Sequence, residues 1–301
     1  MKAGEWIAQF SPAYGWQIAE HTAGCDEAPP GTCSNVPDFL HHIELRTFQF
    51  PLGVTVGLGR GFALTLGDTF LAFRRNVRYE TLGGAPYTQS FPEVHHPNKT
   101  LAGLGDGQAA LRWDGRFGER SMAGISLFTS LPIGRTGENV LRPGVYNRLH
   151  EHIQFGTGAF VPGVELSLNL APRPWGATVW LRRTVPYYDS PRNGFRPAPF
   201  SAMSAGPIRQ LSRESQMSLQ IEWTSFGTES WNGAPNDEAV SKDALAVVAR
   251  YDLAATDRWR WSLQGQFEFW NRLGQPSPGP YDQRARLRQP FVVSTSIAFG
   301  P

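Results

Sequence analysis

The residues best suited to metal chemistry are the histidines, which all lie in or beside expected long loops, no later than residue 152. They are His21, His41, His42, His95, His96, His150 and His152. Imidazole is the commonest protein ligand for borderline transition metals, so two His-His pairs and a His-x-His motif on neighbouring loops could converge on one divalent ion. Alternatively, these histidines lie on the surface of packed loops and bind no metal. Their spacing favours this interpretation, since it matches no strong metal signature. We therefore expect no cofactor; the alternative is a transition metal bound in the loops by His41, His42, His95, His96, His150 and His152.

Two cysteines could form a disulfide bond. Cys25 and Cys33 lie in a loop rich in proline and glycine, and their spacing can close a small ring. An oxidising compartment accounts for such a pair, and two free thiols are the alternative. The segment from Met1 to Trp6 has no apolar region of a signal peptide. We therefore expect either an intracellular protein or a mature chain whose signal peptide has been removed.

Catalytic chemistry finds little support in the sequence. Acyl hydrolysis needs a serine nucleophile within reach of a histidine base, and the segment His150-Glu151-His152 has no such serine nearby. The glycines of Gly57-Leu58-Gly59-Arg60-Gly61 lie in a turn between expected strands, without the helix that a phosphate-binding loop requires. We therefore expect no enzyme.

The elements that would position these residues are long strands with two different faces. Between Arg258 and Phe269, tryptophan, leucine and phenylalanine occupy the odd positions apart from Gly265, and polar residues occupy the even ones. Soluble strands usually end after five or six residues, whereas a tilted membrane strand needs about 9 to 11. The length of this segment therefore indicates a strand that crosses a bilayer.

The same alternation recurs along the chain, and the connections between the segments alternate strictly in length. Short turns are expected at 57–60, 114–119, 172–175, 211–214 and 254–257, and long loops at 20–40, 78–102, 135–152, 189–199, 228–242 and 271–288. This pattern predicts an all-β fold, a single antiparallel transmembrane β-barrel domain over 1–301 with about 12 strands. Short turns and both termini would face the periplasm, and long loops the outside of the cell.

Three segments depart from the simple pattern. The apolar phase switches between Leu45 and Phe48, and Asp68 interrupts the next strand, so we expect bulges at both places. Arg183 occupies an apolar position of its strand. A strand within Phe200–Gln210 is expected mainly because the topology requires it.

Composition excludes several classes of protein. The 301 residues include 32 glycines and 24 prolines, only 18% are charged, and the formal net charge of +2 gives no reason to expect a nucleic-acid partner. Apolar runs are too short for a membrane helix, and the mean hydropathy is −0.33. A soluble β-sandwich or lipocalin-like barrel is the alternative, but it would have to place six long loops at one end.

The polar face of the strands predicts which charged residues point into the lumen. They are Asp106, Arg112, Glu165, Arg182, Glu222, Arg250, Asp252, Arg260 and Glu268. A 12-stranded barrel is wider than the filled eight-stranded barrels and narrower than porins. These residues could therefore line a solute path, or they could close the lumen as a salt-bridged network.

Three segments resemble the barrel family named for the MetA pathway of phenol degradation. They are Leu101-Ala102-Gly103-Leu104-Gly105-Asp106-Gly107, Ser126-Leu127-Phe128-Thr129-Ser130-Leu131-Pro132-Ile133-Gly134 and Phe155-Gly156-Thr157-Gly158-Ala159-Phe160-Val161-Pro162-Gly163. The resemblance implies a Gram-negative outer-membrane barrel that takes up small, often aromatic or hydrophobic compounds. It carries over no catalytic or binding residue.

These observations predict a porin-like outer-membrane channel or transporter for small solutes, with outer-membrane lipid and the solute as its partners. The alternative is a non-conducting anchor whose loops or lumen hold a partner protein.

Overall fold

The computed structural model describes residues 1–23, 37–88, 98–118, 121–137, 154–170, 174–235, 241–256, 258–274 and 286–300. Every regular element in these ranges is a β-strand. None of the described residues forms a helix long and apolar enough to cross a membrane.

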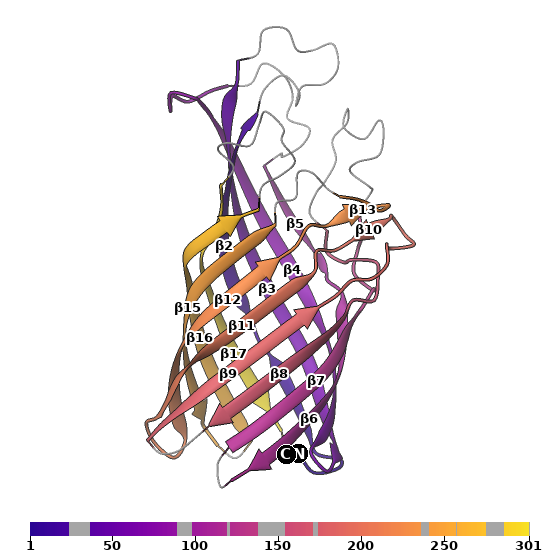
Figure 1. The fold of residues 1–301 in the computed structure, drawn as a ribbon, viewed down its shortest axis with the longest axis vertical. Coiled ribbons are helices and arrows are strands. Elements are labelled where there is room, and N and C mark those ends of the chain that lie inside the picture. The colour runs from indigo at the N-terminus through magenta and orange to yellow at the C-terminus, as the bar shows by residue number, and fades with distance from the viewer. Residues whose placement is uncertain are drawn as a thin grey trace.

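The strands form one closed antiparallel barrel (Figure 1). Its segments are β1 (Trp6–Phe10), β2 (Ala13–Ala23), β3 (Phe39–Gly59), β4 (Phe62–Thr81), β5 (Lys99–Leu104), β6 (Gly107–Phe117), β7 (Ser121–Leu131), β8 (Pro162–Leu170), β9 (Trp175–Thr184), β11 (Phe200–Gln210), β12 (Ser215–Phe226), β15 (Lys242–Ala254), β16 (Trp259–Leu273) and β17 (Arg286–Phe299). Because β1 continues into β2 and β5 into β6, these 14 segments make 12 barrel strands. β3 pairs with both β2 and β4, and β2 pairs with β17, so the ring has no open edge.

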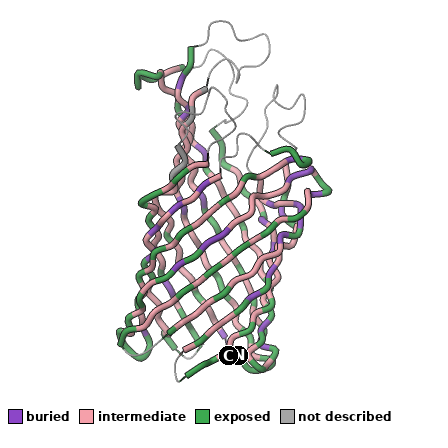
Figure 2. The backbone as a smooth tube through the Cα atoms, in the orientation of Figure 1, coloured by how far each residue is buried: buried purple, intermediate pink, exposed green. Residues whose placement is uncertain are grey.

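The outer face of the barrel is apolar, as the alternating sequence pattern predicts. On β16, Trp259, Leu263 and Phe267 are 47%, 42% and 58% exposed, whereas Ser262 on the opposite face is 8% exposed. Figure 2 shows this alternation of exposed and less exposed positions around the barrel. Apolar side chains exposed all around a closed barrel make a surface that suits a lipid bilayer.

The two termini lie at the end of the barrel that carries the described short turns, and the strand ends that flank the long connections lie at the other end (Figure 1). The tightest turn joins β3 to β4, where Gly59, Arg60 and Gly61 have φ angles of 87°, 52° and 85°. Glycine adopts these angles without steric cost, which explains two of the three residues.

The strand expected within Phe200–Gln210 is confirmed, because β11 spans that whole segment and pairs with both β9 and β12.

The bulges expected in β3 and β4 are wrong. The register runs unshifted from Phe39 opposite Thr81 to Gly57 opposite Ala63, and the shift in this pair lies between Gly57 and Gly59, at the turn. Instead of a bulge, the surroundings of the outer face change along β3, from the apolar belt to a polar region. Phe48, Phe50 and Leu52 form part of the apolar outer face, and beyond Phe48 the same face carries charged residues such as Arg46.

At the upper ends of β2, β3 and β4, the apolar side chains face inward and the polar side chains face outward, which is the reverse of the arrangement in the belt. Figure 1 shows these purple strands rising above the rest of the barrel. The inward face there is apolar: Phe39 and His41 are fully buried, and their rings contact each other and Tyr79. The outward face carries His42, whose imidazole lies 3.0 Å from Glu20 and 3.2 Å from Glu80. The apparent break in the sequence pattern thus marks the level at which the strand leaves the apolar belt.

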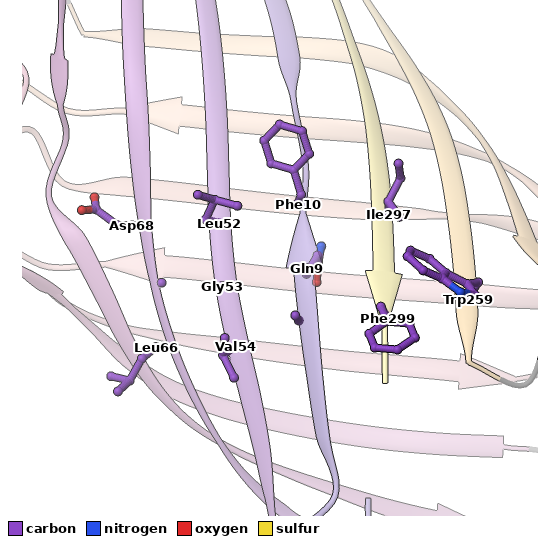
Figure 3. Close-up of a pocket in the computed structure, with 12 residues that line it drawn as sticks. Gln9, Phe10, Leu52, Gly53, Val54, Leu66, Asp68, Trp259, Ile297 and Phe299 are labelled. Atoms are coloured by element: carbon purple, nitrogen blue, oxygen red, sulfur yellow. The ribbon is translucent and has the colours of Figure 1, made fainter. Parts of the chain in front are cut away.

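Asp68 stays on the outer face of β4, directly opposite Leu52 and two residues beyond Leu66 (Figure 3). Its carboxylate accepts a hydrogen bond from the backbone N–H of Thr69 at 2.6 Å. A carboxylate that faces lipid is less well solvated than one in water, so this residue costs stability in a membrane.

We predict that Asp68→Leu raises the free energy of unfolding in vesicles by about 1–2 kcal/mol, because it removes a lipid-facing acidic group. Urea-induced unfolding followed by tryptophan fluorescence measures this change. Asp252→Leu is the matched control and lowers stability, since Asp252 faces the lumen and pairs with Arg250 at 2.7 Å. Unfolding of Asp68→Leu at a lower urea concentration than the parent protein contradicts the lipid-facing assignment.

Candidate functional site: the barrel lumen

The inward face of β11, β12 and β16 carries a row of amide, hydroxyl and carboxylate groups. Ser204 Oγ donates to Gln220 Oε1 at 2.8 Å, and Gln266 Nε2 donates to Glu222 Oε1 at 3.0 Å. These bonds join side chains on neighbouring or next-but-one strands. The alternation that makes the outer face apolar thus leaves a hydrogen-bonded polar wall inside the barrel.

A charged cluster lies across β6, β8 and β9. The Arg112 guanidinium lies 2.8 Å from Asp114 and 3.5 Å from Glu165, and it donates to Ser167 Oγ at 3.1 Å. Glu165 also lies 4.0 Å from Arg182, whose guanidinium is 4.3 Å from the ring centre of Phe128. Two arginines and two carboxylates therefore balance each other on this side of the lumen, and the Phe128 ring adds a cation–π contact.

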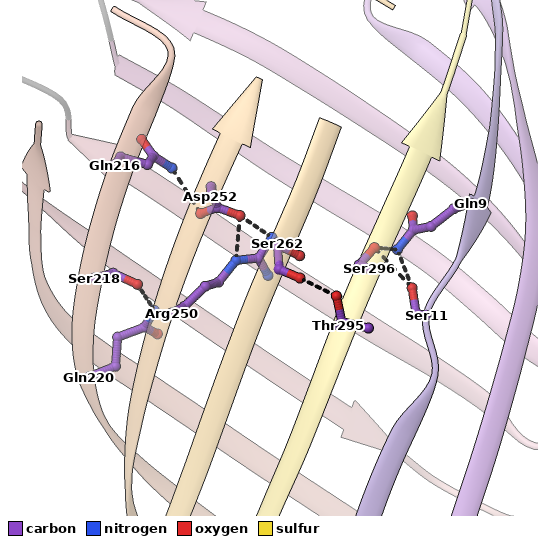
Figure 4. Close-up of polar contacts among 10 residues, drawn as sticks. All are labelled: Gln9, Ser11, Gln216, Ser218, Gln220, Arg250, Asp252, Ser262, Thr295 and Ser296. Carbon is purple, nitrogen blue, oxygen red and sulfur yellow. Dashed lines mark hydrogen bonds and ion pairs between the residues drawn. The ribbon is translucent and has the colours of Figure 1, made fainter. Parts of the chain in front are cut away.

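A second polar group lies on β12, β15, β16 and β17 (Figure 4). Arg250 Nη2 lies 2.7 Å from Asp252 Oδ1, and Gln216 Nε2 donates to Asp252 Oδ2 at 3.2 Å. Higher in the barrel, Lys242 Nζ and Glu268 Oε2 form a buried pair at 2.6 Å, with both side chains 8% exposed. The upper pair is packed into the wall, whereas Arg250 remains 43% exposed.

Arg260 and Arg183 differ from these paired residues. Arg260 occupies an inward position on β16 near the end with the short turns, is exposed, and forms no ion pair within the described part of the chain. Arg183 faces outward on β9 and donates to Ser201 Oγ at 2.6 Å. The apolar position that Arg183 occupies in the sequence pattern is thus an outer-face position.

Asp106 does not join the polar wall that the other predicted residues form. It lies where β5 breaks before β6, and its carboxylate accepts from the backbone N–H of Gly134 at 3.0 Å and of Thr157 at 2.7 Å. The Thr157 hydroxyl donates to the same carboxylate at 2.6 Å. Asp106 therefore joins three segments that are distant in the chain.

We call this contact the Asp106 junction, defined by residues 105–106, 134 and 156–157. A Cβ atom on Gly134 would lie 2.6 Å from the carbonyl carbon of Gly105 and 2.8 Å from Gly156 Cα, so the junction has no room for a side chain there. Sequence reasoning did not predict this convergence, although all three segments appear in the resemblance described above. Their repeated glycines were the available signal.

A small separate sheet lies beside the rim of the barrel (Figure 1). It consists of β10 (Phe195–Arg196), β13 (Ser230–Trp231) and β14 (Ala234–Pro235). Phe195 and Trp231 pack together with ring centres 4.8 Å apart, and Arg196 pairs with Asp189 at 2.8 Å. Ser190 Oγ links this region to the junction segment by donating to the Gly158 carbonyl at 3.1 Å.

The predicted metal ligands do not gather in the described residues. His41 and His42 are neighbours on one strand, so their side chains point to opposite faces and cannot hold one ion together. No group of three or more histidine, cysteine, aspartate or glutamate side chains that could hold a metal occurs in the described part of the chain. His95, His96, His150 and His152, and also Cys25 and Cys33, lie outside the described residues.

Comparisons with known proteins show the class of fold. No family model matches the chain, and no curated protein matches it in sequence. The chain is similar to the COG4313 outer membrane channel from Pseudomonas putida F1, with a TM-score of 0.61 and 11% identity over 100% of this chain and 97% of that chain. Weaker similarities are to a Pseudomonas aeruginosa FadL homologue (TM-score 0.44, 12% identity, 98% and 90% covered) and to the CymD monoaromatic hydrocarbon channel (0.39, 7%, 100% and 88%). The first similarity shows that this chain has the fold of a bacterial outer-membrane β-barrel.

We predict that Asp106→Asn loosens the junction, because one acceptor oxygen becomes an amide that cannot accept. A hydrogen bond to a charged group contributes about 1.5–3 kcal/mol, so the amides of Gly134 and Thr157 should exchange with deuterium at least tenfold faster. Hydrogen–deuterium exchange mass spectrometry of peptides from 131–137 and 154–161 measures the effect. Asp114→Asn is the control, since Asp114 pairs with Arg112 and does not touch the junction. Unchanged exchange in both peptides of Asp106→Asn would show that the carboxylate does not hold these segments.

Proposed function

We propose that the protein is an outer-membrane channel that conducts small solutes through its own lumen. The observation that supports this most directly is the exposure of inward-facing charged side chains. Arg112, Arg182 and Arg250 remain 36%, 31% and 43% exposed inside a closed barrel. Burial of a charge is costly unless the charge is paired. If protein filled the lumen, these arginines would be packed into buried pairs, like the pair that Lys242 and Glu268 form in the barrel wall.

Small, often aromatic or hydrophobic compounds are the solute class that we propose. This proposal rests on the three segments that resemble the family named for the MetA pathway of phenol degradation, and we propose that the chain is a relative of that family. The fold shared with the COG4313 outer membrane channel of Pseudomonas putida F1 supports the proposal of a channel and does not bear on the solute. Phe128 adds an aromatic ring to the lumen wall beneath Arg182, with only 7% of the residue exposed.

The arginines of the lumen should give the channel an anion preference, because like charges in a confined pore raise the local concentration of counter-ions. Arg250 is already balanced by Asp252, whereas Arg260 has no such partner within the described residues. Arg260 should therefore contribute more to selectivity than Arg250 does.

We predict that purified protein conducts in planar bilayers, and that Arg260→Gln shifts the reversal potential under a salt gradient toward cations more than Arg250→Gln does. The double variant should shift it furthest while the barrel stays folded, as lumen substitutions tune selectivity. Arg183→Gln is the control, since Arg183 lies on the outer face and should leave selectivity unchanged. Uptake of small aromatic compounds by proteoliposomes tests the solute class separately.

A folded protein that neither conducts nor takes up solute at several voltages would contradict the channel proposal. That result would favour a non-conducting anchor, in which the same charges close the lumen and the long loops hold a partner protein.

A further inference from the structure

Two arginines lie side by side on the outer face of the barrel, just above the apolar belt. Arg46 of β3 and Arg74 of β4 are directly opposite each other in the register, and both occupy outward positions. Like charges directly opposite across two strands are destabilising unless an opposite charge compensates them. Glu44 accepts from Arg46 Nε at 2.8 Å, but no hydrogen bond or ion pair joins the exposed Arg74 to another residue within the described ranges. This pair therefore leaves a positive charge uncompensated.

Along the barrel axis, the two arginines lie at the height of the lipid headgroups. The row immediately below Arg46 and Arg74 contains Phe48, whose ring centre lies 5.1 Å from that of Tyr14. Tyr14 in turn lies 5.8 Å from Phe291. Aromatic rings gather in this way at the boundary between the apolar belt and the polar interface. The guanidinium groups consequently stand where phosphate groups of the outer leaflet lie.

Below the pair, the outer face of β3 and β4 and of the adjoining β1, β16 and β17 is hollowed into a groove of about 600 Å³ (Figure 3). Its walls include Phe10, Leu52, Val54, Leu66, Ile297 and Phe299, and the small Ala8 lies among them. Asp68, at the edge, turns its carboxylate to its own strand through the hydrogen bond to Thr69 N. The groove therefore presents a largely apolar surface to the membrane.

The separation between the arginines and the groove matches the length of an acyl chain in one leaflet. Leu52 lies six residues from Arg46, which is about 20 Å along a β-strand. With the usual strand tilt of about 40°, this is about 15 Å along the membrane normal, or half of a hydrocarbon core that is about 30 Å thick. A lipid with its headgroup at the arginines would place the end of its chain in the groove.

We infer that Arg46 and Arg74 bind the phosphate group of an anionic lipid of the outer leaflet, and that an acyl chain of the same lipid lies in the groove beside Ala8, Leu52 and Leu66. Arginine binds phosphate through paired N–H donors, and the bond from Arg46 Nε to Glu44 leaves the terminal nitrogens of that guanidinium available. The lipid phosphate supplies the negative charge that the cross-strand arginine pair lacks. This inference rests on the membrane placement of the barrel and not on conduction through its lumen.

The test measures lipid binding by native mass spectrometry on the full chain in detergent, with dioleoyl phosphatidic acid as the probe and dioleoyl phosphatidylcholine as the zwitterionic reference. We expect one phosphatidic acid to be retained at least tenfold more tightly than phosphatidylcholine. Arg46→Gln together with Arg74→Gln should abolish that difference, and Arg74→Gln alone should weaken it. Arg78→Gln is the matched control and should bind as the parent does, because Arg78 lies farther out on the same face and 3.7 Å from Glu80.

Further measurements distinguish the groove from the arginines, and a lipid phosphate from free inorganic phosphate. Ala8→Trp fills the groove, so it should weaken dioleoyl phosphatidic acid but not the dihexanoyl form, whose chains are too short to reach it. Equal affinity for phosphatidic acid and phosphatidylcholine, or unchanged binding by the double variant, would overturn the inference. Displacement of phosphatidic acid by an equal concentration of inorganic phosphate would also overturn it, since the site would then bind a free anion. Bilayer conductance of each variant is recorded separately, so loss of lipid binding with conductance intact shows that the lipid site is distinct from the channel.

Discussion

The structure depends on one constraint, which is that every strand of the barrel separates two different solvents. Backbone N–H and C=O groups inside a membrane have no water to bond, so the wall must be a closed hydrogen-bonded ring. Successive side chains then face lipid and lumen in turn, and each strand needs apolar residues at one parity and polar residues at the other. On β16 this requirement is met from Trp259 to Phe267 with Gly265 as the one small residue on the outer face. The polar lumen is therefore a consequence of the same alternation that makes the outer face apolar.

Where the wall rises above the apolar belt, the constraint reverses. The outward side of β3 and β4 there lies outside the apolar belt and carries polar groups such as His42 and Arg46, while the inward side packs aromatic rings around Phe39 and His41. No residue is inserted to achieve this, because the register of the two strands is continuous. A change of surroundings along one regular strand is enough to make the sequence pattern look interrupted.

The lumen and its mouth are held by contacts between segments that are far apart in the chain. Glu165 lies between Arg112 and Arg182 from strands on either side of it. Asp106 binds the backbone at Gly134 and Thr157, and the close approach of three glycines makes that contact sterically feasible. These contacts place charge and loop backbone on one side of the barrel. The other side carries the Arg250–Asp252 and Lys242–Glu268 pairs among amide and hydroxyl groups, so both sides of the lumen are polar.

By itself, the sequence determined the properties that local periodicity encodes. The alternation in segments such as Arg258–Trp270 predicts which side chains face lipid, and the alternation of short and long connections predicts the strand number and the position of both termini. Phe200–Gln210, whose pattern is weak, could be assigned because an antiparallel ring requires a strand between its neighbours. Only the tertiary structure decided which charges pair across strands, that Asp106 holds loop backbone, and that Arg46 and Arg74 stand opposite each other above the apolar belt. Periodicity defines the face of each residue, but the height of a residue on that face follows from register and tilt, which a single sequence does not specify.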